Sequence, residues 1–199
     1  MIVREISREA MLELPIERYE GEVCLVETPE DFARAKADLL QETVVGFDTE
    51  TRPAFRKGES YHPSLFQAAT ARAVYLFQLR RREAFPLLTG LLSEKRIVKA
   101  GVAVADDLRT LKHVFPFVDH SVVDLGLIAR RAGYGQTGLR NLAGIFMGMR
   151  ITKGTKTSNW AAPVLTAQQI SYAATDAWVC RELYLRFEKE GLMRGATSE

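Results

Sequence analysis

The sequence predicts a single α/β domain built around one mixed β-sheet. Strand-like runs come first along the 199 residues, followed by a mixture of strands and helices and then mostly helices. The runs 64–70 and 73–79 are separated only by Ala71 and Arg72, which favours an antiparallel hairpin. No linker-like stretch divides the chain, so we expect this hairpin and the strand–helix units to share one sheet.

The first elements follow a polar segment at 1–20, which we expect to be a loosely organised extension. The run 22–27 alternates and is rich in β-forming residues, which predicts a strand. The next segment has the start signals of a helix: Thr28 as the cap, Pro29 in the first turn and Asp31 to complete a capping box.

The remaining elements are predicted by apolar periodicity and by their start and stop residues. Besides the hairpin, we expect strands at 44–49 and 96–102. A flexible basic loop is predicted at 149–159. The predicted helices cover residues 105–115, 124–133, 138–148 and 166–191, and 83–92 is predicted as a short helix or two turns.

The composition is typical of a soluble globular protein, with 47% hydrophobic and 26% charged residues. No apolar run approaches the ~20 residues needed to span a bilayer, and the acidic N-terminus does not resemble a signal peptide. Cys24 and Cys180 lie far apart and form no metal or redox motif. We therefore expect a cytoplasmic protein with reduced thiols and no membrane partner. The net charge of +2 neither indicates nor excludes nucleic acid, because a local basic patch would suffice.

The strand "VVGFDTET" (44–51) ends in two acids, Asp48 and Glu50. Because side chains alternate along a strand, both carboxylates should point to the same face. Further along the chain, Asp176 lies inside an otherwise apolar helix, four residues after Tyr172, which places the two side chains on one helix face. A buried charge at that position needs a partner.

Carboxylates that converge repel one another, so a cation is needed to compensate them. Hard oxygen ligands suit Mg²⁺ or Mn²⁺ and not Zn²⁺, and His62, His113 and His120 are scattered. Two such ions form the clamp used for phosphodiester cleavage. The alternative for each acid is an ordinary structural role, such as ending a strand or capping a helix.

Three motifs in order resemble the DEDD 3′–5′ exonucleases, the DnaQ-like group with an RNase H-like fold. These motifs are "FDTET", "KAGVAVADDLRTL" and "YAATDAW", the last in the Tyr-x-x-x-Asp form of the DEDDy subgroup. The segment "SNW" followed by "LTAQQISYAATDAW" is similar to RNase D and to the Werner-type exonuclease domain. The resemblance implies an RNase H-like domain over 21–192, after the extension 1–20 and before a tail at 193–199.

The resemblance implies that Asp48, Glu50, Asp107 and Asp176 hold two Mg²⁺ or Mn²⁺ ions and that Tyr172 orients the attacking water. In this arrangement Asp48 bridges both ions, Glu50 and Asp176 hold one, and Asp107 holds the second partly through water. For the second motif, Asp106 is the alternative to Asp107, which is favoured because an apolar residue follows it. The alternative for Tyr172 is a core tyrosine with its hydroxyl at the surface.

Six further residues are predicted to contact the substrate. Thr49 should point away from Asp48, so its contact would come from its backbone, and Trp160 either stacks on a base or anchors its loop in the core. Basic residues would bind phosphates, with a solvated loop as the alternative. The six are Thr49, Thr51, Arg52, Lys153, Lys156 and Trp160.

The resemblance implies hydrolytic removal of nucleotides from a nucleic-acid 3′ end. RNase D-type chains normally append helical domains that 199 residues do not accommodate. DNA is therefore slightly favoured, and RNA trimming of the RNase D kind is the first alternative. A non-catalytic scaffold is the second alternative, which the intact acid set argues against. The sequence leaves the oligomeric state open.

Overall fold

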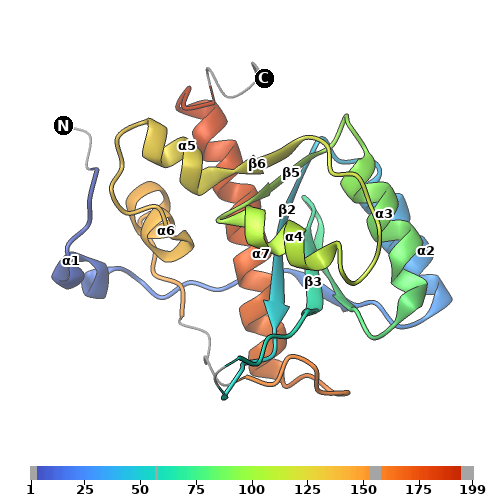
Figure 1. Cartoon of the computed structure of the whole chain (residues 1–199). Helices are drawn as coiled ribbons and strands as arrows, with labels where there is room; N and C mark the ends of the chain where they lie inside the picture. Colours follow the sequence, from blue (N-terminus) through green and yellow to red (C-terminus); the bar gives the residue numbers. More distant parts are fainter. Residues whose placement is uncertain (1–3, 57, 153–157, 194–199) are drawn as a thin grey trace.

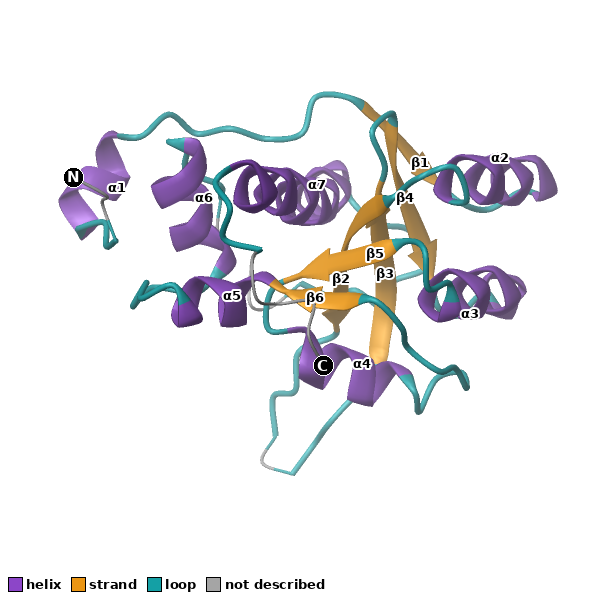
Figure 2. Cartoon of the chain, turned by 90° about the horizontal axis from the view of Figure 1, so that it is seen from above, coloured by secondary structure: helices purple, strands orange, loops and turns teal. Residues whose placement is uncertain are grey.

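The computed structural model describes residues 4–56, 58–152 and 158–193, in which helices cover both faces of one β-sheet (Figures 1 and 2). The strands are β1 (Glu22–Leu25), β2 (Val44–Thr51), β3 (Pro63–Ala69), β4 (Ala73–Gln78), β5 (Val98–Gly101) and β6 (Val122–Asp124). The helices are α1 (Arg8–Glu13), α2 (Pro29–Leu39), α3 (Phe85–Ser93), α4 (Val104–Leu111), α5 (Leu125–Arg131), α6 (Leu139–Met147) and α7 (Ala167–Lys189), with a 3₁₀ turn η1 (Arg82–Ala84). The predicted single mixed α/β sheet is confirmed.

The strand order in the sheet is β1-β4-β3-β2-β5-β6. The central strands β2, β3 and β4 are antiparallel neighbours, which confirms the predicted hairpin. Parallel pairs extend the sheet on both sides: β1 pairs with β4, β5 with β2, and β6 with β5. In the antiparallel register, Asp48 of β2 lies directly opposite Gln67 of β3.

Alternation along the strands divides the apolar side chains between two layers. Val45 and Phe47 of β2 belong to the core under α2, α3 and α4. Leu65 and Ala69 of β3 point to the other face, where they pack with residues of α7. Figure 2 shows α2 and α3 together on one side of the sheet and α5, α6 and α7 on the other.

Helix α7 spans 23 residues and covers the face to which Asp48 and Glu50 belong. It begins as predicted at Thr166, which forms a capping box with Gln169. Among the helices of the described residues, none combines the length and the apolar character required to cross a bilayer.

Two predictions about secondary structure need correction. The edge strand β6 at residues 122–124 was not predicted, whereas the helix predicted to start near Asp124 is present as α5, with Asp124 as its N-cap. The N-terminal segment is more ordered than predicted: α1 lies within it, and both backbone groups of Ile6 hydrogen-bond the side chain of Gln136. The predicted tail begins at residue 193, and 194–199 lie outside the described residues.

Candidate active site

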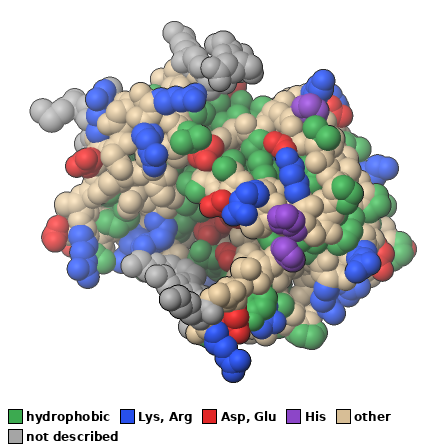
Figure 3. All heavy atoms as spheres, in the orientation of Figure 1, with side chains coloured by type: hydrophobic (Ala, Val, Ile, Leu, Met, Phe, Trp, Pro, Cys, Tyr) green, Lys and Arg blue, Asp and Glu red, His purple; other side chains and the backbone are tan. Residues whose placement is uncertain are grey.

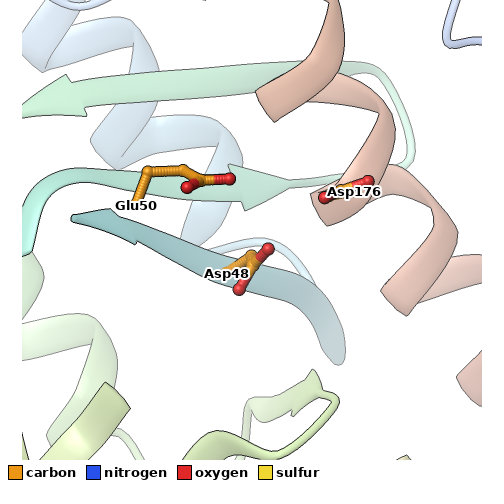
Figure 4. A group of neighbouring side chains, drawn as sticks. All are labelled: Asp48, Glu50 and Asp176. Atoms are coloured by element: carbon orange, nitrogen blue, oxygen red, sulfur yellow. The ribbon is translucent and has the colours of Figure 1, made fainter. Parts of the chain in front are cut away.

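Strand β2 supplies the first two acids of the site. Asp48 and Glu50 are half-buried near its C-terminal end, and Thr49 between them is buried on the opposite face. Figure 4 shows the two carboxylates projecting from β2 on the side that faces α7. The predicted alternation of the strand is therefore present.

Gly46 lets α7 approach this strand closely. A Cβ atom at Gly46 would lie 2.2 Å from the carbonyl oxygen of Ala177 and 2.5 Å from the amide nitrogen of Arg181. Both are backbone atoms of α7, so any side chain at position 46 would push the helix away from the sheet. The glycine thus sets the distance between β2 and the helix that carries Asp176.

Helix α7 supplies the third acid and its tyrosine neighbour. Asp176 is buried, and the hydroxyl of Tyr172, one turn earlier, lies within hydrogen-bonding reach of it. The ring of Tyr172 packs against Trp160, with 6.0 Å between ring centroids. These contacts hold the Tyr172 hydroxyl beside the acids.

The three acids converge although they come from segments more than a hundred residues apart. One carboxylate oxygen from each of Asp48, Glu50 and Asp176 lies within 4.8 Å of the other two. Within the described part of the chain, none of the three forms an ion pair with a lysine, arginine or histidine. Figure 3 shows acidic side chains inside a hollow on this face, with basic and histidine side chains beside it. This arrangement fits a bound cation.

Asp107 reaches the site from the other face of the sheet. It lies in the first turn of α4, and its Oδ1 accepts a hydrogen bond of 2.7 Å from the hydroxyl of Thr49. Asp106 points to solvent instead and pairs with Arg109 at 3.0 Å. The structure therefore favours Asp107 over Asp106, while a role for Asp107 as a metal ligand stays a prediction. Asp107 is not one of the three acids that lie within 4.8 Å of one another.

The environment raises the pKa of every acid in the site. Burial is the main cause for Asp48, and the charges of Asp176 and Asp107 add to it. Burial and the same two charges raise the pKa of Glu50 to about 8. Burial raises the pKa of Asp176 to about 7, although Tyr172 and Arg140 act in the opposite direction. Without a cation, the charged form of this cluster is therefore unfavourable.

We expect the metal-free protein to lose stability as the pH rises through this range. Between about 4 and about 8, folded Glu50 binds more protons than unfolded Glu50, because its pKa rises from the ordinary 4.5 to about 8. The contribution of Glu50 to stability is fully present below about pH 4 and is lost as the pH rises past about 8. In chelator, the free energy of unfolding of Glu50→Gln, relative to the wild type, should therefore increase from pH 5 to pH 8.5.

Denaturant unfolding of both proteins across this pH range tests the prediction. The comparison with Glu50→Gln cancels the titration of groups elsewhere in the chain. Saturating Mn²⁺ should remove the advantage of the variant, because the cation stabilises the ionised carboxylates. If the free energies of unfolding of the wild type and Glu50→Gln differed by the same amount at every pH, the raised pKa of Glu50 would be contradicted.

Four of the residues predicted to contact the substrate lie within the described residues, and they differ in burial and in contacts. Thr49 lies on the face away from Asp48, as predicted, but the sequence did not reveal that its hydroxyl binds Asp107. Thr51 is exposed at the end of β2, and the guanidinium of the exposed Arg52 lies over the ring of Tyr61, 3.9 Å from its centroid. Trp160 is only 5% exposed and packs in the core, which is the anchoring role that the sequence left open.

Two of the predicted contacts, Lys153 and Lys156, lie outside the described residues. The sequence did not indicate one basic residue that lies near the acids: the charge of Arg140 in α6 lowers the pKa of Asp176. Its Nε donates a 3.2 Å hydrogen bond to the carbonyl of Ile151. A single arginine in a helix has no distinguishing sequence signal, so only the fold reveals that it lies near the acids.

Comparison with curated proteins identifies relatives that match most of this chain. Ribonuclease D of Gluconacetobacter diazotrophicus is 30% identical over 183 residues, which cover 88% of this chain and 46% of that protein. An exonuclease mut-7 homolog of Aedes aegypti is 27% identical over 196 residues, which cover 86% of this chain and 27% of the relative. The chain thus spans less than half the length of these relatives.

Solved structures show the same fold. The Nibbler exonuclease domain of Aedes aegypti superposes with a TM-score of 0.77 at 22% identity, covering 92% of this chain and 95% of that one. NrnC of Brucella melitensis, solved with pGG, gives a TM-score of 0.71 at 23% identity over 89% of this chain and 87% of that one. The predicted RNase H-like fold is confirmed. A model of the 3′–5′ exonuclease family matches residues 23–191, nearly the whole chain. The chain therefore belongs to the 3′–5′ exonuclease family.

Proposed function

We propose that this protein removes nucleotides one at a time from the 3′ end of a nucleic acid by phosphodiester hydrolysis that depends on divalent cations. One observation carries the proposal: Asp48, Glu50 and Asp176 converge within 4.8 Å without an ion-pair partner among the described residues. In a member of the 3′–5′ exonuclease family, this is the arrangement that a cation-dependent phosphodiesterase needs.

The donor set suits two Mg²⁺ or Mn²⁺ ions. The three converging acids offer only carboxylate oxygens, which these hard cations prefer. Asp48 would contact both ions, Glu50 and Asp176 would hold one, and Asp107 would hold the other, partly through water. Bound cations would lower the pKa of a water molecule and stabilise the charge on the departing 3′-oxygen.

The protein's own side chains would orient the reactants. Burial, followed by the charge of Asp176, raises the pKa of the Tyr172 hydroxyl above its ordinary value. Tyr172 is therefore protonated at neutral pH, so it acts as a hydrogen-bond donor or acceptor that orients the attacking water and not as a base. The Thr49 hydroxyl fixes one oxygen of Asp107 and leaves the other available.

Basic residues around the acids would bind the phosphate backbone. Arg140 lies close enough to influence Asp176, and Arg52 is exposed just after β2. Such contacts are independent of base sequence and weaken as salt is added. We expect them to hold the strand while the 3′ end occupies the acidic site.

DNA and RNA are both candidate substrates. The resemblance of the motifs to Werner-type exonuclease domains favours DNA slightly. The relatives named ribonuclease D, one of them 30% identical over 88% of this chain, favour RNA as the second candidate. The chemistry at the acids is the same for both, so contacts to the 2′-hydroxyl would decide between them.

Matched DNA and RNA oligomers, each labelled at the 5′ or the 3′ end, test the proposal. With Mn²⁺, the 5′-labelled strands should shorten stepwise, and the 3′ label should leave at once as a mononucleotide. Comparing the initial rates on DNA and RNA measures the preference.

Stepwise loss from the 5′ end would overturn the proposed polarity. A protein that releases no nucleotides and is not thermally stabilised by Mn²⁺ or Mg²⁺ would instead be a non-catalytic scaffold that has kept the fold.

A further inference from the structure

A buried polar side chain without a partner lies beside the acid cluster. Gln67 of β3 is fully buried, and neither its Oε1 nor its Nε2 has a hydrogen-bond partner among the described residues. The other buried glutamine of the sheet, Gln78, differs, since its Nε2 donates to the carbonyl of Ala162 at 3.0 Å. Buried amides are almost always hydrogen-bonded, so the exception at Gln67 needs an explanation.

The strand register places this side chain against Asp48. Gln67 and Asp48 are directly opposite in the antiparallel pair β2–β3, so their side chains share one face with Cβ atoms about 5 Å apart. The face is the one covered by α7, because Leu65, two residues earlier on the same strand, packs with Ala177. The carboxamide therefore lies in the layer between sheet and helix where the acids converge.

Asp107 and Asp176 each have a side-chain hydrogen-bond partner, whereas for Asp48 and Glu50 the described residues provide none. The Thr49 hydroxyl binds Asp107, and the Tyr172 hydroxyl lies within reach of Asp176. Among the described residues, the Asp48 carboxylate accepts a hydrogen bond only from the backbone N–H of Thr49, at 2.9 Å. Carboxylates that ligate metals are normally held by an outer hydrogen bond that fixes their orientation.

We propose that Gln67 is a positioning residue for the metal site, with its carboxamide hydrogen-bonding the outer side of the Asp48 carboxylate, directly or through one water, when divalent cations are bound. The inference rests on the proposed function. A neutral amide suits this position because it donates without adding a positive charge that would compete with the cations. An apolar side chain would leave the carboxylate free to turn away from the metals.

Calorimetric titration of Mn²⁺ into the protein without nucleic acid tests the inference. Gln67→Met keeps the length of the side chain and removes the amide, and Gln78→Met is the matched control in the neighbouring strand. We expect Gln67→Met to weaken Mn²⁺ affinity by about 10–100-fold, the usual effect of losing such a partner, and Gln78→Met to bind like the wild type. Gln67→Asn, which withdraws the amide by one methylene, should fall between the wild type and Gln67→Met.

Two further measurements separate positioning from a structural role. The metal-free Tm of Gln67→Met should equal or exceed that of the wild type, because the variant no longer buries an unpaired amide. In nucleotide release, the Mn²⁺ concentration for half-maximal rate should rise, and kcat at saturating Mn²⁺ should return close to the wild-type value.

The possible results are distinguishable. Wild-type Mn²⁺ affinity in Gln67→Met would overturn the inference and leave the proposed function intact. Equal losses in the Gln67 and Gln78 variants would also overturn it, since they would indicate general loosening of the sheet. A wild-type protein that binds no Mn²⁺ would overturn both the inference and the proposed function.

Discussion

Asp48→Asn is expected to lower the rate of nucleotide release by roughly a thousandfold or more at saturating Mn²⁺. The same variant should increase the stability of the metal-free protein at pH 8. The activity falls because Asp48 converges with Glu50 and Asp176 and its pKa also responds to the charge of Asp107, and an amide is a poor ligand for hard cations. Losses of this size are typical when a member of a catalytic unit is removed.

Without metal, Asp48→Asn should be more stable than the wild type because the buried negative charges that attract a cation also repel one another. Burial and the charges of Asp176 and Asp107 raise the pKa of Asp48 well above its ordinary value, so the ionised form opposes folding. Asparagine has the same shape and no charge. Conversely, Mn²⁺ at a hundred times its dissociation constant should stabilise the wild type by about 2.7 kcal/mol, and the variant much less.

Stepwise shortening of a 5′-labelled oligomer and thermal unfolding with and without Mn²⁺ measure both effects. The control is Asp106→Asn, which removes an exposed acid paired with Arg109 and should change neither quantity. An Asp48→Asn protein that kept its activity, or that was less stable than the wild type in chelator, would be incompatible with the proposed site.

The parts of the site that could be predicted depend on local periodicity. Alternation along β2 placed Asp48 and Glu50 on one face, and the four-residue spacing in α7 placed Tyr172 beside Asp176. Both relations hold because the period of a strand or helix is fixed by its backbone geometry. The order of the strands and the meeting of β2 with α7 depend on contacts between distant segments, which periodicity does not encode.

The errors have the same origin. Strand β6 has three residues, too few to show alternation, and it exists because it pairs with β5, more than twenty residues earlier. Its last residue, Asp124, also caps α5 through the N–H of Leu127, which is why the sequence resembles a helix start. The Thr49–Asp107 hydrogen bond could not be predicted either, because it joins β2 to α4 across 58 positions.

Gly46→Ala should destabilise the fold by about 3 kcal/mol, the upper end of the range for overpacking a core, and should also impair the site. The new methyl group would lie 2.2 Å from the Ala177 carbonyl and 2.5 Å from the Arg181 amide. These are backbone atoms in the middle of a 23-residue helix, so no side-chain rotation relieves the clash and α7 must move. That movement would carry Asp176 away from Asp48.

A displacement of about 1 Å at a reacting centre lowers rates by roughly a hundredfold, so even the folded Gly46→Ala molecules should be poorly active. Urea unfolding, with nucleotide release measured well below the transition, separates the two effects. Gly90→Ala is the matched control, because Gly90 lies in α3 and a Cβ there meets no heavy atom within 4 Å. In that helix the alanine should stabilise the protein by about 0.5–1 kcal/mol. If Gly46→Ala were as stable as Gly90→Ala, the close approach of α7 to β2 would not be what brings the acids together.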